Sequence, residues 1–211
     1  MRDAIRHIIQ KGQREELIIV MLTYAHNAFL TEKFFIHGLK VLGIDYADVL
    51  VLGFFSKPPS RSIMDGAVRL KEKGLVRFLG LSGHNRKLFP EIRDAFDLFH
   101  IRYNAAHRGA ETETFPYLKG EDRPGVVSFT ATRRRQLLNP RKMPKGERPP
   151  TALDCYRFVL SNPSIDVCMM GAKNIEQMKA NLLVLEHGPM TDEELRRMRR
   201  IGDHVHGDKA V

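Results

Sequence analysis

Short apolar runs that end in polar, often glycine-containing turns recur along this chain. Polar groups at the carboxyl ends of successive strands are typical of a binding site on one face of a parallel βα sheet or barrel. We therefore expect an α/β protein whose site lies at those strand ends. The clearest cases are 75–79 leading into Gly80-Leu81-Ser82-Gly83-His84-Asn85-Arg86, 126–129 leading into Thr130-Ala131-Thr132-Arg133, and 167–170 leading into Gly171-Ala172-Lys173-Asn174.

The spacing of apolar residues predicts strands that alternate with helices. The repeat length of roughly 25–35 residues suits about six serial βα units with right-handed crossovers. Gly74 is expected as the C-cap of the helix before it. The predicted strands cover 17–23, 48–55, 75–82, 97–103, 125–130 and 165–170, and the predicted helices between them cover 28–42, 62–73, 151–161 and 174–187.

The two ends of the chain carry helical patterns. Residues 2–11 are amphipathic, so the fold opens in the middle of a βα unit. Thr191 and Glu194 form a capping box that begins an extra basic helix over 195–201, which Gly202 is expected to end. The Pro-rich basic stretch 139–150 is too long for a plain connector, and it is either a cofactor-covering loop or a disordered surface excursion.

Composition points to one compact domain over residues 1–211. The chain has 43% hydrophobic residues, no run long enough to cross a membrane and no apolar segment near its first residues that resembles a signal peptide. Cys155 and Cys168 lack metal-ligand spacing, so we expect reduced thiols, no metal site and a cytoplasmic location.

The net charge of +9 allows two interpretations. One is nucleic-acid binding, and the other is a solvated basic surface or a pocket for a polyanionic cofactor. The basic residues are scattered, no aromatic residues interleave them and Trp is absent, which argues against nucleic acid. The basic helix, with Arg196, Arg197, Arg199 and Arg200, is either a patch for an anionic partner or a solvated helix face.

Two strand ends have side chains suited to anions. Thr130, Thr132 and Arg133 offer hydroxyls, backbone N–H groups and a cation to a pyrophosphate, although a solvated basic turn would look the same. Gly171 and Lys173 begin a helix, where the backbone and the helix dipole favour negative charge. Lys173 could pair with a 2′-phosphate, and simple capping by Asn174 is compatible with that role.

Several strand-end residues allow either chemistry or packing. His84, His107 and Arg108 each follow a strand end, where a His can donate a proton or simply pack. The sequence contains no recognisable nucleophile–His–acid set and no metal-ligand spacing. No catalytic side chain is therefore assigned.

Four further motifs follow one another along the chain: Asp45-Tyr46-x-Asp48, the segment from Lys73 to Ser82, Tyr103-Asn104, and Met170-Gly171-Ala172-Lys173-Asn174-x-x-Gln177-x-x-x-Asn181. Together they resemble the aldo-keto reductase family, an NADPH-binding (β/α)8 barrel. The likeness extends over nearly the whole chain and implies a partial barrel of about six βα units with an extra C-terminal helix.

The resemblance implies an NADP cofactor and a set of cofactor-binding residues. Ser82 would hold the nicotinamide carboxamide, and His100 aligns with a Gln of the family's sixth strand. Gln177 and Asn181 match the Gln and Asn that the family carries on the helix after its eighth strand. The remaining cofactor-binding residues are Thr130, Thr132, Arg133, Gly171, Ala172 and Lys173.

The departures from the family pattern concern catalysis. The family uses Tyr, Lys, Asp and His; Leu22 and Gly53 stand at the Lys and His positions, and the Asp and Tyr would precede residue 1. We therefore expect a truncated, catalytically impaired NADP-dependent carbonyl reductase of unknown substrate. The alternative is a non-catalytic nicotinamide-nucleotide or anion-binding subunit that acts through oligomerisation. With the first barrel strands missing, the apolar strand 17–23 becomes an open edge, which predicts a homo-oligomer or aggregation.

Overall fold

The computed structural model describes residues 2–207. The strands form one six-stranded sheet in which each strand neighbours the next in sequence, in the order β1-β2-β3-β4-β5-β6. The chain divides into two compact units, residues 1–99 and 100–211, with β4 (Leu98–Arg102) at the division. The organisation of residues 1–211 as a single domain stays a prediction.

The first unit contains three parallel strands in register. Val20 of β1 pairs with Val49 of β2, and Ala47 of β2 pairs with Val76 of β3. The predicted helices 2–11, 28–42 and 62–73 are confirmed within a residue at each end. The elements are α1 (Arg2–Gln10), β1 (Val20–Thr23), α2 (Ala28–Leu42), β2 (Ala47–Leu52), α3 (Arg61–Glu72), β3 (Val76–Gly83) and α4 (Leu88–Glu91), with short 3₁₀ turns at Arg14–Glu16 and Arg93–Ala95.

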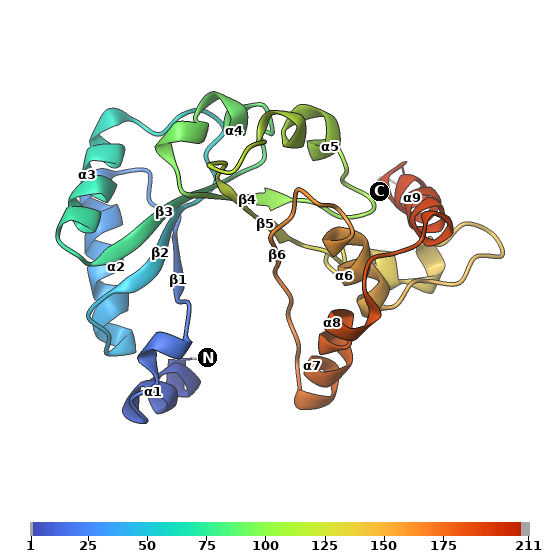
Figure 1. Cartoon of the computed structure of the whole chain (residues 1–211), viewed down its shortest axis with the longest axis horizontal. Coiled ribbons are helices and arrows are strands. Elements are labelled where there is room, and N and C mark those ends of the chain that lie inside the picture. The colour runs from blue at the N-terminus through green and yellow to red at the C-terminus, as the bar shows by residue number, and fades with distance from the viewer. Residues whose placement is uncertain (1, 208–211) are drawn as a thin grey trace. The chain divides into compact units, whose positions relative to one another are not determined.

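The core of this unit lies between the strands and the two long helices. Every residue of β2 is buried, as expected for a parallel strand covered on both faces. In Figure 1, α2 and α3 lie side by side along β1–β3. The Asn27 side chain caps α2 by accepting a hydrogen bond from Leu30 N, and Gly43 ends the helix at a φ of 73°.

A charged cluster lies where the strands of this unit begin. The buried Asp48 carboxylate accepts hydrogen bonds from Ile19 N, Arg14 and Arg77 at 2.8, 2.9 and 3.1 Å. Burial raises the pKa of Asp48, but these hydrogen bonds and the two guanidinium charges outweigh it and hold that pKa below its usual range. The Tyr46 ring lies between the same two guanidinium groups, 4.2 and 4.3 Å from their carbons. The Asp45-Tyr46-x-Asp48 motif therefore serves this ion-pair cluster.

The second unit combines one parallel strand pair with helices and short 3₁₀ turns. Val127 of β5 pairs with Val167 of β6. Helix 174–187 was predicted as one element but is two, because the chain turns at Leu183. The elements are α5 (Ala110–Glu113), β5 (Gly125–Phe129), α6 (Ala152–Leu160), β6 (Val167–Cys168), α7 (Ile175–Leu182), α8 (Val184–His187) and α9 (Asp192–Gly207), with 3₁₀ turns at Phe115–Tyr117, Gln136–Leu138 and Pro140–Lys142.

Helix α9 corrects one prediction about its end. Gly202 does not stop the helix, which continues to Gly207. A Cβ atom at Gly202 would run into the carbonyl of Ala105, so this glycine is needed for close packing against the loop after β4. The predicted capping box is confirmed, since Thr191 N donates to the Glu194 carboxylate at 2.8 Å and Glu194 N donates to Thr191 Oγ1 at 3.3 Å.

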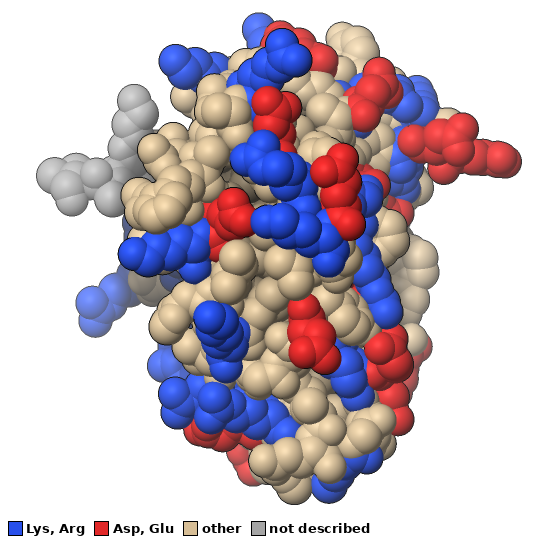
Figure 2. Space-filling model, turned by 90° about the vertical axis from the view of Figure 1, so that its left-hand side faces the viewer, with Lys and Arg blue, Asp and Glu red and all other residues tan. Residues whose placement is uncertain are grey.

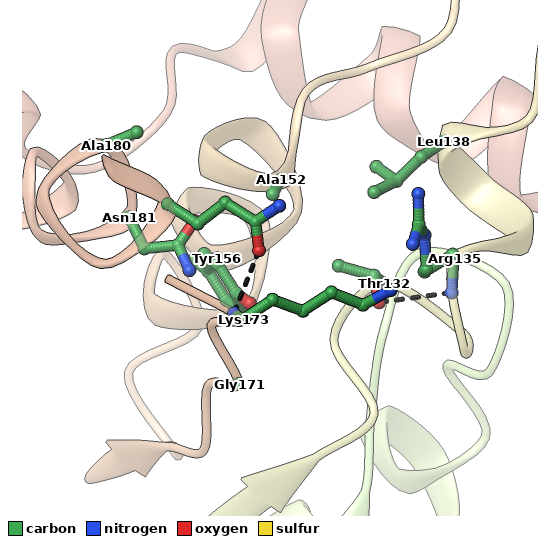
Figure 3. A pocket seen from close by; sticks show the side chains of 10 residues that line it. Thr132, Arg135, Leu138, Ala152, Tyr156, Gly171, Lys173, Ala180 and Asn181 are labelled. Carbon is green, nitrogen blue, oxygen red and sulfur yellow. Dashed lines mark hydrogen bonds between the residues drawn. The ribbon is translucent and has the colours of Figure 1, made fainter. Parts of the chain in front are cut away.

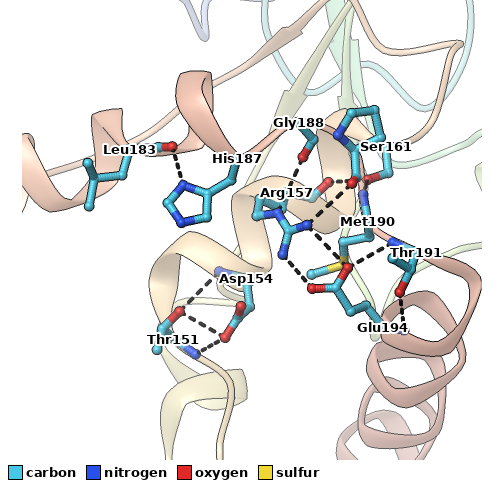
Figure 4. A network of polar contacts seen from close by, with 11 residues as sticks. Thr151, Asp154, Arg157, Ser161, Leu183, His187, Gly188, Met190, Thr191 and Glu194 are labelled. Carbon is cyan, nitrogen blue, oxygen red and sulfur yellow. Dashed lines mark hydrogen bonds and ion pairs between the residues drawn. The ribbon is translucent and has the colours of Figure 1, made fainter.

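Arg157 connects α6 to the start of α9. Figure 4 shows its guanidinium beside the Glu194 carboxylate, at 2.6 and 3.1 Å, while it also donates to the carbonyls of Gly188 and Pro189. The hydrogen bonds from Arg157 to the carboxylate are the largest cause that lowers the pKa of Glu194 to about 2, and the Thr191 N–H adds to them. Both helices that meet here are thus capped and cross-linked by polar contacts.

Several basic residues form ion pairs with nearby acids. In α9, Arg197 pairs with Glu147 and Arg199 pairs with Glu111, so these two form intramolecular ion pairs instead of a free basic face. Figure 2 shows one face of the molecule, on which basic and acidic side chains are interspersed. Within residues 2–207, no helix has the length and apolar character needed to cross a bilayer.

Candidate functional site

A cavity of about 290 Å³ lies in the second unit, between the turn after β5 and the start of α7 (Figure 3). Its lining combines two cations, two amides, a hydroxyl and an aromatic ring. The ten described lining residues include no carboxylate, so the cavity has a positive character. They are Thr132, Arg135, Leu138, Ala152, Tyr156, Gly171, Lys173, Gln177, Ala180 and Asn181.

One wall of the cavity is the turn that leads into α7. Asn174 caps the helix by accepting a hydrogen bond from Gln177 N at 2.9 Å, and the Gln177 side chain accepts one from Lys173 N at 3.0 Å. These two bonds fix the turn, and the Lys173 side chain extends across the cavity toward Thr132 (Figure 3). A Cβ atom at Gly171 would meet no atom within 4 Å, so the backbone there faces open space. The turn thus offers a cation and an accessible backbone.

The opposite wall is the turn after β5. Thr132 Oγ1 accepts a hydrogen bond from Arg135 N at 3.2 Å, which places the hydroxyl and the Arg135 side chain on the same wall. Arg133, Arg134 and Arg135 all have positive φ angles, 49°, 52° and 69°. Residues with side chains rarely adopt this conformation, and it concentrates at functional sites.

The cavity has an aromatic side and a buried amide. Burial raises the pKa of Tyr156 above its usual value, against the opposing effect of a hydrogen bond with the Gly171 backbone. The phenol is therefore neutral at physiological pH and offers a ring face and a hydroxyl. Asn181, on α7, is 6% exposed. Together with Tyr156 it would contact a planar group.

The structure brings five of the ten predicted cofactor-binding residues together around this cavity. They are Thr132, Gly171, Lys173, Gln177 and Asn181.

Three others lie beside the cavity without lining it. Ala172 sits in the α7 turn. The Arg133 guanidinium donates to the carbonyl of Val205 on α9. Thr130 donates its hydroxyl to the Phe129 carbonyl at 2.8 Å.

The other two predicted residues are buried strand residues. Ser82 lies at the end of β3 in the first unit, where its carbonyl accepts a hydrogen bond from Phe55 N at 3.1 Å. His100 lies in β4, and burial lowers its pKa, which favours the neutral imidazole. Their cofactor roles stay predictions.

Sequence reasoning missed two chemically useful lining residues. Arg135 was not among the predicted residues, and its place in the basic run directly after Arg133 was the available signal. Tyr156 lies on α6, and nothing in its local sequence marks it as a cavity residue. Its role depends on tertiary packing against the α7 turn.

The ends of β1 and β2 are apolar and aromatic, whereas β3 leads into the polar turn 82–86. A Cβ atom at Gly53 would come within 2.7 Å of the Thr23 carbonyl oxygen and 2.9 Å of the Tyr24 ring, so no side chain fits there without movement. The rings of Tyr24 and Phe54 stack with centroids 5.1 Å apart, and Phe54 has a φ of 56°. Leu22 precedes this stack, so the two positions aligned with the family's Lys and His supply no proton-moving group.

The donors around the cavity suit an anion better than a metal. Lys173, Arg135 and the Thr132 hydroxyl can all donate hydrogen bonds, which matches phosphate oxygens. Among the described residues, no group of three or more His, Cys, Asp and Glu side chains is placed to hold a metal ion. The arrangement supports binding of a phosphorylated ligand.

Comparison with known proteins identifies the fold. No family model matches the sequence, and no curated protein matches it. The chain is similar in structure to the holo form of aldo-keto reductase AKR11C1 from Bacillus halodurans, with a TM-score of 0.77 and 22% identity. The match covers 95% of this chain and 76% of that one, and the apo form of the same protein gives a TM-score of 0.76 over the same shares.

This likeness shows that the chain has the fold of the aldo-keto reductases. The alternation of parallel strands and helices agrees with it, and the predicted partial (β/α)8 barrel with a C-terminal helix is confirmed as the fold class. Activity and ligands do not follow from fold alone.

Proposed function

We propose that this chain is an aldo-keto reductase-like protein that binds NADP through the cavity of its second unit and is catalytically impaired. The observation that carries the proposal is the pairing of Lys173 and Arg135 around a cavity whose ten described lining residues include no acid. Such a donor set would favour a ligand with several phosphate oxygens. NADP has a pyrophosphate and a 2′-phosphate.

The donor set fits the phosphate-bearing end of this cofactor. Lys173 supplies a single mobile cation, suited to a terminal 2′-phosphate, and Arg135 supplies a planar guanidinium. Thr132 adds a hydroxyl, and Gly171 leaves its backbone open to a close approach. A cavity of about 290 Å³ is at the small end for a ligand site, so it would hold part of the cofactor.

The bound cofactor would supply hydride chemistry. Reduction of a carbonyl also needs an acid near the developing oxyanion. Leu22 and Gly53 cannot provide or orient one, and the crowding at Gly53 argues that this position carries no catalytic side chain. We therefore expect this 211-residue chain to turn over common aldehydes no faster than background, and its substrate, if it has one, stays unknown.

Calorimetric titration of the chain with NADPH and NADH tests the proposal. NADPH should bind more tightly, and Lys173→Ala should remove that preference because Lys173 pairs with the 2′-phosphate. Lys179→Ala is the matched control, since Lys179 is an exposed lysine of α7 that does not line the cavity. Equal affinity for the two cofactors, or an unchanged preference in Lys173→Ala, would refute the assignment.

The alternative is a non-catalytic nucleotide- or anion-binding subunit that acts through oligomerisation. The apolar side chains of Ile18, Val20 and Leu22, at and just before β1, support it because they are 81%, 45% and 42% exposed, and β1 is at the end of the strand order. An exposed apolar edge strand pairs readily with another chain.

Light scattering separates the alternatives when combined with turnover assays. Self-association that falls in Val20→Lys, with NADPH binding and no aldehyde turnover, would favour the subunit. A monodisperse 24.2 kDa species that binds NADPH without aldehyde turnover would favour the impaired reductase, and clear aldehyde turnover would contradict both proposals.

A further inference from the structure

The turn after β5 has a backbone that needs external support. Thr130, Arg133, Arg134 and Arg135 have φ angles of 60°, 49°, 52° and 69°. Each conformation is unfavourable for a residue with a side chain, most of all for the β-branched Thr130. Residues in such conformations persist when the surrounding structure holds them.

Two side-chain contacts attach the turn to the rest of the second unit. The Arg133 guanidinium donates a hydrogen bond to the carbonyl of Val205, close to the C-terminal end of α9. Helix C-termini favour cations because their last carbonyls lack partners within the helix. The Asn104 amide donates to the Thr130 carbonyl at 2.8 Å. Neither Arg133 nor Asn104 lines the cavity.

The loop after β4 and helix α9, to which the turn is attached, are themselves joined by several contacts. Asn104 is fully buried, and its amide oxygen accepts a hydrogen bond from Ala106 N at 3.0 Å. Arg108 joins the same loop to α9, since it donates to the Arg199 carbonyl at 3.2 Å and pairs with Asp203 at 2.7 Å. The close packing of Gly202 on Ala105 leaves no room for the helix to approach further. Helix α9 and the loop after β4 therefore hold the turn from two sides.

The supported turn carries two of the cavity's polar side chains, Thr132 and Arg135. Thr132 precedes the three arginines with positive φ angles and Arg135 is the last of them, and the hydrogen bond from Arg135 N to Thr132 Oγ1 closes the turn. If the turn relaxed to ordinary φ angles, the direction of the Arg135 side chain would change and this bond would be lost. The anion affinity of the cavity then depends on contacts made outside it.

We propose that Arg133 and Asn104 are positioning residues, which hold the turn 130–135 against α9 and the loop after β4 so that Thr132 and Arg135 face a phosphate in the cavity. This inference rests on the proposed function of the cavity. It makes the C-terminal end of α9 part of the binding apparatus, although α9 contributes no lining residue.

The test compares Arg133→Ala with Arg134→Ala in the full chain. Both remove one positive charge from the same turn, but Arg134 is exposed and does not line the cavity. Titration with NADPH and with inorganic pyrophosphate at constant ionic strength should show about ten-fold weaker binding in Arg133→Ala, as expected for loss of a charge-assisted hydrogen bond. Arg134→Ala should change affinity by less than about three-fold, since an exposed charge is largely screened. Arg133→Lys should recover most of the loss, because a lysine can still donate to Val205.

Amide hydrogen exchange without ligand gives a second, independent readout. In Arg133→Ala, exchange should rise in the turn 130–135 while α6 stays protected. Equal effects of the two alanine variants on binding and exchange would overturn the proposal, as would failure of Arg133→Lys to restore either. If the unmodified protein binds neither probe, the proposed function fails, and exchange in the turn still decides whether Arg133 holds it.

Discussion

The strand ends of the two units differ in the side chains they present. In the first unit, β1 and β2 lead into Leu22, Gly53 and the stacked rings of Tyr24 and Phe54, while β3 leads into the polar turn 82–86. In the second, the corresponding turns present a hydroxyl, a guanidinium and an ammonium group around a cavity. Under the proposed function, ligand binding and proton transfer belong to different loops of a shared scaffold.

The first unit still depends strongly on charged residues, but at the opposite ends of its strands. Asp48→Ala should lower the free energy of unfolding by about 3–5 kcal/mol, because it leaves Arg14 with a largely buried, uncompensated charge. Denaturant unfolding at neutral pH measures the loss. Asp65→Ala removes a carboxylate from an exposed 3.9 Å pair with Arg61 and should change stability by less than about 0.5 kcal/mol.

The depressed pKa of Asp48 fixes the sign of its pH dependence. The contribution of Asp48 to the free energy of unfolding is fully present above the pKa that its carboxyl has in the unfolded state. It is lost as the pH falls through the lower pKa of the folded state. The difference between the unmodified protein and Asp48→Ala should therefore shrink in acid. A difference that grows in acid, or equal losses for Asp48→Ala and Asp65→Ala, would show that the cluster is not the main support of this end of the strands.

Placing Lys and His at positions 22 and 53, where the aldo-keto reductases carry them, tests the contrast between the strand ends of the two units directly. Leu22→Lys with Gly53→His should yield no NADPH-dependent aldehyde turnover, because the Gly53 site has no room for a side chain. Overpacking there should cost about 1–3 kcal/mol. Leu22→Lys alone is the control, since Leu22 is exposed and should tolerate the change. Turnover by the double variant, without loss of stability, would mean that the first unit is closer to a working site than its packing indicates.

Local sequence signals predicted the elements of the fold well. Gly74 was predicted to end the helix before it, and its φ of 70° just after α3 agrees with a signal that depends on a few neighbouring residues. The capping box of Thr191 and Glu194 is equally local. Gly202 was misinterpreted because its role is set by Ala105, far away in the sequence, and a tertiary contact overrode the local stop signal.

The candidate site was predicted only where its residues follow directly from local sequence and strand order. Lys173 and Thr132 follow strands, and parallel topology brings strand ends to one edge, so their placement could be inferred. Arg133 was predicted to bind the ligand; its guanidinium donates to the Val205 carbonyl, while Arg135 lines the cavity. The positive φ angles of Arg133, Arg134 and Arg135 could not be predicted from residue type, since none of the three is a glycine.

The smallest expected effect concerns the polar contact between α6 and α9, which sharpens the contrast with the buried Asp48 cluster. Glu194 is 39% exposed at its side chain, so solvent screens its pair with Arg157. Glu194→Gln should therefore lower the free energy of unfolding at neutral pH by about 1 kcal/mol or less, despite the pKa of about 2 that Arg157 and the Thr191 N–H impose on Glu194. The stability that this lowered pKa contributes is present above pH 4.5, the usual pKa of the carboxyl, and is lost as the pH falls toward 2. Unfolding measured at pH 7 and pH 3 should show a smaller difference in Glu194→Gln than in Glu193→Gln, which changes a neighbouring acid in the same first turn. If the two variants behave alike, the Arg157 pair adds nothing measurable, and α9 is held by its packing on the loop after β4.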